Sequence, residues 1–173
     1  SALDAVVEAV RLMEDCPLFN AGHGSVFTSL GTHELDASVM EGSELNVGVV
    51  SVAHRIKNPV LAARAVLEKS EHMYFSGDGA DAFAEAQGLG MVDPSYFSTE
   101  FRREQLVRAQ QTKSGKAILD HDGQALVAEA RQATEVRGEK REGGPIDEDR
   151  KMGTVGAVAV DLKGNLAAAT STG

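Results

Sequence analysis

The stretch GTVGAVAVDLKGNLAAATSTG, residues 153–173, decides the fold of this chain. Two segments of small and β-branched residues flank a turn-forming segment from Asp161 to Asn165. Small side chains allow neighbouring backbones to approach closely. We therefore predict a tightly packed β-hairpin from Thr154 to Thr172.

The turn also predicts which residues of the hairpin face each other. A two-residue loop at Lys163 and Gly164 would set Val155 opposite Thr172. Thr154 would then lie beside Thr172, either diagonally or directly across the strand pair. Cross-strand neighbours on one face interact, so we expect the two threonine hydroxyls to meet.

The segment before this hairpin has a different composition. Twelve of the twenty-one residues from 131 to 151 are charged, with mixed signs, and a Gly-Gly-Pro run interrupts any periodicity. Such a composition predicts a flexible linker. A linker that ends at Gly153, directly before a buried strand, marks a place where the chain can be cut without loss of core contacts.

A cut before Thr154 would place an α-amine and a hydroxyl on one residue. The amine has an unperturbed pKa of about 7.7–8.0, so it can act as a general base near neutral pH. Gly153 supplies a carbonyl that no side chain shields, which makes attack by the Thr154 hydroxyl chemically reasonable. An ordinary strand-opening threonine is the alternative that the residues alone leave open.

The rest of the chain predicts an α+β fold in a single domain spanning residues 1–173. Ser1 to Asp4 has the form of a capping box. Strands are expected at 32–40 and 45–53. We expect a mostly antiparallel sheet with helices packed outside it. Helices are predicted at 1–16, 59–69, 80–87 and 99–112.

Composition excludes several classes of partner. The formal charge is −9, from 17 Lys and Arg against 26 Asp and Glu, and no basic stripe is present, so nucleic acid is not expected. No apolar run approaches the roughly 20 residues of a membrane span. Cys16 is the one cysteine, which favours a reducing compartment and a cytoplasmic location.

Four short segments carry a resemblance to a known family. They are MGTVGAV at 152–158, GNLAAATSTG at 164–173, CPLFNAG at 16–22 and HELDA at 33–37. Together they resemble the plant-type L-asparaginases and isoaspartyl peptidases, which are N-terminal nucleophile hydrolases. The resemblance implies an αββα sandwich, self-cleavage between Gly153 and Thr154, and assembly as an (αβ)₂ heterotetramer.

The resemblance also implies roles for individual residues. Thr154 would be the nucleophile, Thr172 the second active-site threonine, and Asn20 an asparagine close to the cleavage site. The substrates would be L-asparagine and β-aspartyl dipeptides, hydrolysed through an acyl-enzyme without a cofactor. The resemblance further implies a structural sodium ion in the turn from Met13 to His23, held by main-chain oxygens of the kind that suit hard cations. The expected carbonyl donors are Met13, Glu14, Cys16, Phe19, Ala21 and His23.

Parts of the family pattern do not fall within these 173 residues. The first strand would precede Ser1, and the substrate clamp and the oxyanion hole would follow Gly173, so the sandwich is expected to be incomplete here. Two alternatives stay open, a glycosylasparaginase-type amidase and a non-catalytic binding relative.

Glu34 and Asp36 share a predicted strand face, where exposed carboxylates are common, and we expect no catalytic role for them.

Overall fold

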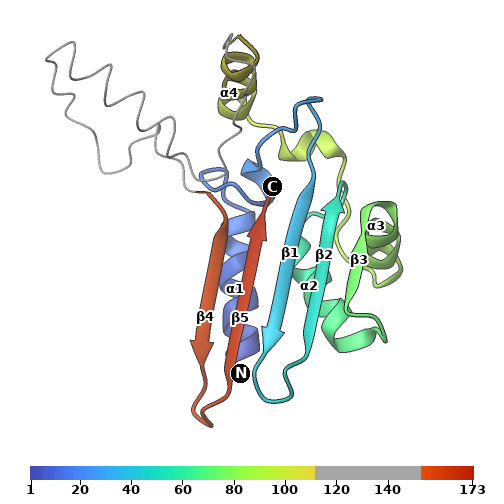
Figure 1. Ribbon diagram of the computed structural model, residues 1–173, viewed down its shortest axis with the longest axis vertical. Helices are drawn as coiled ribbons and strands as arrows, with labels where there is room; N and C mark the ends of the chain where they lie inside the picture. Colours follow the sequence, from blue (N-terminus) through green and yellow to red (C-terminus); the bar gives the residue numbers. More distant parts are fainter. Residues whose placement is uncertain (112–152) are drawn as a thin grey trace, which may run out of the picture.

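The computed structural model describes residues 1–111 and 153–173, and a five-stranded sheet forms its centre (Figure 1). The predicted segment 131–151 lies outside the described residues. The strands are β1 (Leu35–Glu41), β2 (Val47–Ala53), β3 (Tyr74–Ser76), β4 (Val155–Val160) and β5 (Leu166–Thr172).

The strand order is β3-β2-β1-β5-β4, and only the β2–β3 pair is parallel. The mostly antiparallel sheet is therefore confirmed. Strands β1 and β5 are adjacent at the centre of the sheet although about 130 residues separate them in the chain. This pairing carries the C-terminal hairpin into the same sheet as the first half of the chain.

Within residues 1–111 and 153–173, four helices accompany the sheet, and two short 3₁₀ turns lie in the loops. The helices are α1 (Ala2–Glu14), α2 (Pro59–Lys69), α3 (Gly77–Ala86) and α4 (Glu100–Gln111), and the turns are η1 (Gly22–Gly24) and η2 (Pro94–Phe97). Helix α3 begins three residues earlier than predicted, because Gly77 to Gly79 form its first turn instead of a loop. Gly77 adopts the positive φ of 55° that glycine tolerates.

Local signals explain where the first two helices begin. Ser1 and Asp4 form both hydrogen bonds of a capping box at the start of α1. Pro59 occupies the first turn of α2, where a missing amide hydrogen costs nothing. Both helices pack on one face of the sheet, α1 behind β4 and β5 and α2 behind β1 and β2 (Figure 1).

The core lies between these two helices and the sheet. Val6 and Val10 of α1 and Val60 and Val66 of α2 are fully or almost fully buried. The inward positions of the strands alternate with exposed ones, as the pleat requires. The other face of the sheet carries no helix among the described residues, and Val158 and Val160 are 85% and 65% exposed there.

The predicted register of the C-terminal hairpin is wrong by one residue. Val155 pairs with Ser171 instead of Thr172. The reason is a three-residue loop, closed by hydrogen bonds between Asp161 and Asn165 and ending on Gly164 at a φ of 82°. A loop of three residues with glycine in the left-handed conformation is a common hairpin connection.

Among the residues that the structure describes, no helix is long and apolar enough to cross a membrane.

Candidate active site

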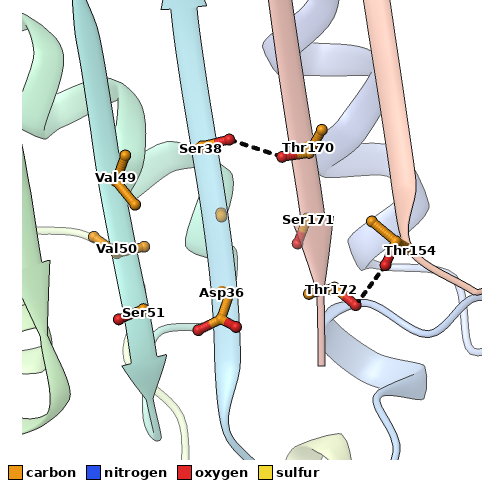
Figure 2. Close-up of a pocket in the computed structure, with 10 residues that line it drawn as sticks. Asp36, Ser38, Val49, Val50, Ser51, Thr154, Thr170, Ser171 and Thr172 are labelled. Atoms are coloured by element: carbon orange, nitrogen blue, oxygen red, sulfur yellow. Dashed lines mark hydrogen bonds between the residues drawn. The ribbon is translucent and has the colours of Figure 1, made fainter. Parts of the chain in front are cut away.

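Thr154 and Thr172 meet at one end of the C-terminal hairpin. Thr154 directly precedes β4, and Thr172 is the last residue of β5. The Thr154 hydroxyl donates a hydrogen bond of 2.9 Å to the Thr172 hydroxyl (Figure 2). The corrected register makes the two residues direct neighbours across the strands, so the predicted meeting of their hydroxyls is confirmed.

The two threonines lie at the edge of a shallow groove on the uncovered face of the sheet. Its volume is about 290 Å³, just below the range of about 300–1,000 Å³ that is typical of ligand pockets. Asp36 is the one charged residue among those that line it. The lining residues are Asp36, Ala37, Ser38, Val49, Val50, Ser51, Thr154, Thr170, Ser171 and Thr172.

The uncovered face is divided into a polar end and an apolar end. At the polar end, Thr170 and Ser38 join their hydroxyls at 2.8 Å, close to the threonine pair (Figure 2). At the other end Val160, Leu166 and Met40 are exposed. The polar end provides hydroxyl groups for chemistry, whereas the apolar end has the character of a surface that packs against another layer.

Asn20 fixes the backbone that follows Thr172. Its side chain is 1% exposed, accepts a 2.9 Å bond from the amide of Val26, and donates a 3.3 Å bond to the carbonyl of Gly173. Gly173 packs so tightly against Ser25 that a Cβ there would lie 2.9 Å from the Ser25 Cα. In the part of the chain that the structure describes, the Asn20 side chain thus bonds the residue after Thr172 and neither threonine hydroxyl.

Gly153 is half-buried and precedes the exposed Thr154. The peptide between them therefore lies directly before β4, between a half-buried and an exposed residue. This position agrees with the requirement that a cleavable peptide be accessible while the strand that follows stays packed.

The turn from Met13 to His23 presents several carbonyl oxygens around two glycines. A Cβ on Gly24 would collide with the carbonyl of Phe19 and lie 2.6 Å from that of Pro17, and a Cβ on Gly22 would collide with the carbonyl of Glu14. The chain therefore passes so close to these carbonyls that only glycine fits at either position. Main-chain carbonyl oxygens are the kind of donor that a sodium ion prefers.

Other expected sodium donors already accept backbone hydrogen bonds. The carbonyls of Met13, Cys16 and Ala21 accept from nearby amides at 3.1–3.4 Å. A carbonyl oxygen has two lone pairs, so each can still coordinate a cation. The ring of His23 bonds the carbonyl of Tyr96 through Nδ1 at 2.6 Å, while its predicted sodium donor is the main-chain oxygen. The sodium site stays a prediction.

A family model described as asparaginase matches residues 1–173. The chain belongs to the asparaginase family. It is 53% identical over 173 residues to the isoaspartyl peptidase of Escherichia coli K12, covering 100% of this chain and 47% of that protein. It is 48% identical over 180 residues to a putative isoaspartyl peptidase/L-asparaginase of Dictyostelium discoideum, covering 100% of this chain and 51% of that protein. The isoaspartyl peptidase/L-asparaginase of Danio rerio is 42% identical, with 100% and 47% covered.

This asparaginase-family chain spans about half the length of the curated relatives that it matches. Family membership confirms the resemblance that the four motifs carry.

Asp36 is a site residue that the sequence analysis missed. Glu34 lies outside β1, so the two carboxylates do not form a pair on one strand face. Asp36 instead pairs directly with Thr172 of β5 and accepts a 2.8 Å hydrogen bond from the amide of Val52. No sequence signal indicates this position, because it depends on the pairing of strands that are distant in the chain.

Glu14 and His33 are buried titratable groups near the site of this asparaginase-family chain. Burial raises the pKa of the Glu14 carboxyl to about 7, although the amide of Val60 donates a 2.9 Å hydrogen bond to it that favours the charged form. Burial also lowers the pKa of His33, whose ring bonds Val26 and Ser98. Neither side chain lines the groove beside Thr154, so both hold loops and helices in place around it.

Proposed function

We propose that the parent protein of this chain is a threonine amidohydrolase that cuts itself before Thr154 and then uses Thr154 as its nucleophile. The observation that carries the proposal is the 2.9 Å bond between the Thr154 and Thr172 hydroxyls at the start of β4. The asparaginase-family membership supports the same assignment.

Self-cleavage needs only groups at this junction. The Thr154 hydroxyl attacks the carbonyl carbon of Gly153, the carbon–nitrogen bond breaks as the carbon–oxygen bond forms, and the hydroxyl proton passes to the leaving nitrogen. The product is an ester at Gly153 with a free α-amine on Thr154. Water then hydrolyses the ester and releases the hydroxyl, so Thr154 becomes the first residue of a new chain.

Hydrolysis of substrate follows from the same two groups. The hydroxyl of Thr154 attacks the side-chain carbonyl of the substrate while its proton passes to the α-amine. The α-amine returns the proton to the leaving ammonia or amino acid, and water cleaves the remaining aspartyl ester. Thr172 holds the hydroxyl of Thr154 in one orientation, which keeps the nucleophile aimed at the groove.

We propose L-asparagine and β-aspartyl dipeptides as the substrates. The relatives from Dictyostelium discoideum and Danio rerio are named isoaspartyl peptidase/L-asparaginase, although the first is named so putatively. The groove beside Thr154 has room for a substrate of this size.

We also propose that residues of the parent outside this chain complete an αββα sandwich and an (αβ)₂ assembly. The exposed apolar residues Val158, Val160, Leu166 and Met40 support a second layer over the open face of the sheet. A sodium ion in the turn from Met13 to His23 would hold that turn beside Asn20. The free thiol of Cys16 is consistent with a cytoplasmic location.

The test uses the full-length parent, purified in wild-type form and as Thr154→Ala. Wild type is expected to appear as two chains on a denaturing gel and to release ammonia from L-asparagine and aspartate from β-aspartyl dipeptides. Thr154→Ala is expected to stay one chain and to release neither. Normal processing and turnover in Thr154→Ala would overturn the proposal, and an uncut, inactive wild type would favour the non-catalytic alternative.

A further inference from the structure

The pairing of β1 with its neighbouring strand β2 is irregular at Asp36. On one side of β1, Leu35 pairs with Ala53 and Ala37 pairs with Val50, so two residues of β2 oppose Asp36 alone. This is a β-bulge, and bulges are frequent next to active sites, where they direct a side chain. On the other side of β1, Asp36 pairs directly with Thr172.

The bulge contains a strained residue. Val52 has a φ of 53°, in the left-handed region that is unfavourable for a β-branched side chain. Leu45 is the other non-glycine residue with positive φ among the described residues, and it lies in the turn between β1 and β2, where such a value is common. Val52 by contrast lies within a strand, so something must hold it there.

The carboxylate of Asp36 provides that restraint. Its Oδ1 accepts the amide hydrogen of Val52 at 2.8 Å, which replaces the partner that the bulge removes from the strand ladder. A hydrogen bond to a charged acceptor is stronger than one between neutral groups. The side chain of Asp36 therefore ties the strained conformation of Val52 to the backbone position that faces Thr172.

We propose that Asp36 is a positioning residue for the threonine pair, acting by holding the bulge at Val52 in place. The proposal rests on the proposed function of Thr154. Without the carboxylate, Val52 would relax toward an extended conformation and the end of β1 would shift against β5. Thr172 would then lose the position from which it orients Thr154.

The alternative is that Asp36 acts through its charge on the substrate. The two roles differ in what restores activity. Glycine adopts a positive φ without strain, so Val52→Gly would keep the bulge even when the carboxylate is absent. It would not replace a charge that contacts the substrate. Asp36→Asn distinguishes the roles as well, because its amide oxygen can still accept the hydrogen bond from Val52 while the charge is lost.

The experiment measures kcat and KM for L-asparagine in the full-length parent, normalised to the fraction of chains cut before Thr154. We expect Asp36→Ala to lower kcat by about 10- to 100-fold with KM within about twofold, the pattern of a misplaced reactive group. Asp36→Asn is expected to stay within about threefold of wild type. The double variant Asp36→Ala with Val52→Gly is expected to return to within about threefold of Val52→Gly alone.

A matched control substitutes glycine at the other strained position. Leu45 is exposed, lies outside the groove and also has a positive φ of 61°. Asp36→Ala combined with Leu45→Gly is expected to remain as slow as Asp36→Ala, because the relief of strain in the turn does not restore the bulge.

An unchanged kcat in Asp36→Ala would overturn the inference, and so would an equal fall in kcat with and without Val52→Gly. If the wild type is active, the proposed function stands in either case. A rise in KM that Val52→Gly does not reverse would also overturn it, in favour of substrate contact. An inactive wild-type parent would overturn the proposed function, and this inference with it.

Discussion

Replacing Thr172 with valine should slow the proposed hydrolysis moderately and leave self-cleavage possible. Valine has nearly the shape of threonine, so Thr172→Val removes a hydroxyl without opening a cavity at the end of β5. What is lost is the 2.9 Å bond that the Thr154 hydroxyl donates. The nucleophile itself stays in place.

The size of the effect follows from that one bond. A hydrogen bond between neutral groups contributes about 0.5–1.5 kcal/mol net. At about 1.36 kcal/mol for each factor of ten in rate, this corresponds to a fall in kcat of about 2- to 13-fold. Thr172→Ser retains the hydroxyl and should lose less than Thr172→Val does.

The assay follows ammonia release from L-asparagine by the full-length parent, with the cut fraction measured by intact mass. Thr170→Val is the matched control, since Thr170 lies two residues earlier on the same strand and bonds Ser38 instead of Thr154. We expect its kcat to change by less than about twofold. An unchanged rate in Thr172→Val, or an equal fall in Thr170→Val, would refute the orienting role of Thr172. Complete inactivity would show that Thr172 does more than orient.

Three further predictions concern the nucleophile, the packing and the pH dependence of stability. Thr154→Ser should keep part of both self-cleavage and hydrolysis, measured by gel and ammonia release, because it retains the oxygen and loses only the methyl that restricts the rotamer. Gly48→Ala should destabilise the parent by about 1–3 kcal/mol in thermal denaturation, because its Cβ would collide with the backbone of α2, whereas Gly156→Ala meets only ordinary contacts at 3.4 Å and should be near neutral. Burial lowers the pKa of His33 below the unfolded value of 6.5, so its contribution to stability is present above pH 6.5 and is lost as pH falls through that value toward the folded pKa. His33→Gln should therefore flatten the melting temperature between pH 7 and pH 5, and an unchanged slope would contradict this reasoning.

Local interactions made much of the fold predictable from the sequence. The capping box at Ser1 and the proline at the start of α2 act within a few residues of the helix that each begins. The alternation of apolar residues in β1 and β2 likewise reports burial on one face of a strand. The contrast between the charged segment at 131–151 and the hairpin after it also marked Thr154 as an unusual threonine.

Register and long-range pairing required the tertiary structure. The loop before Asn165 closes over three residues instead of two, and this difference of one residue changed every pair in the hairpin. Turn length depends on backbone angles, such as the positive φ of Gly164, that the residue types only partly specify.

The sequence by itself determined that a threonine stands between a charged segment and a strand, and that a second threonine lies within reach on the same hairpin. Only the tertiary structure decided that Asp36 lies beside them. Its position results from the pairing of β1 with β5 and from the bulge at Val52, and both join backbone segments that are far apart in the chain. Local propensity and periodicity act over a few residues, so they carry no information on which distant strand becomes the neighbour.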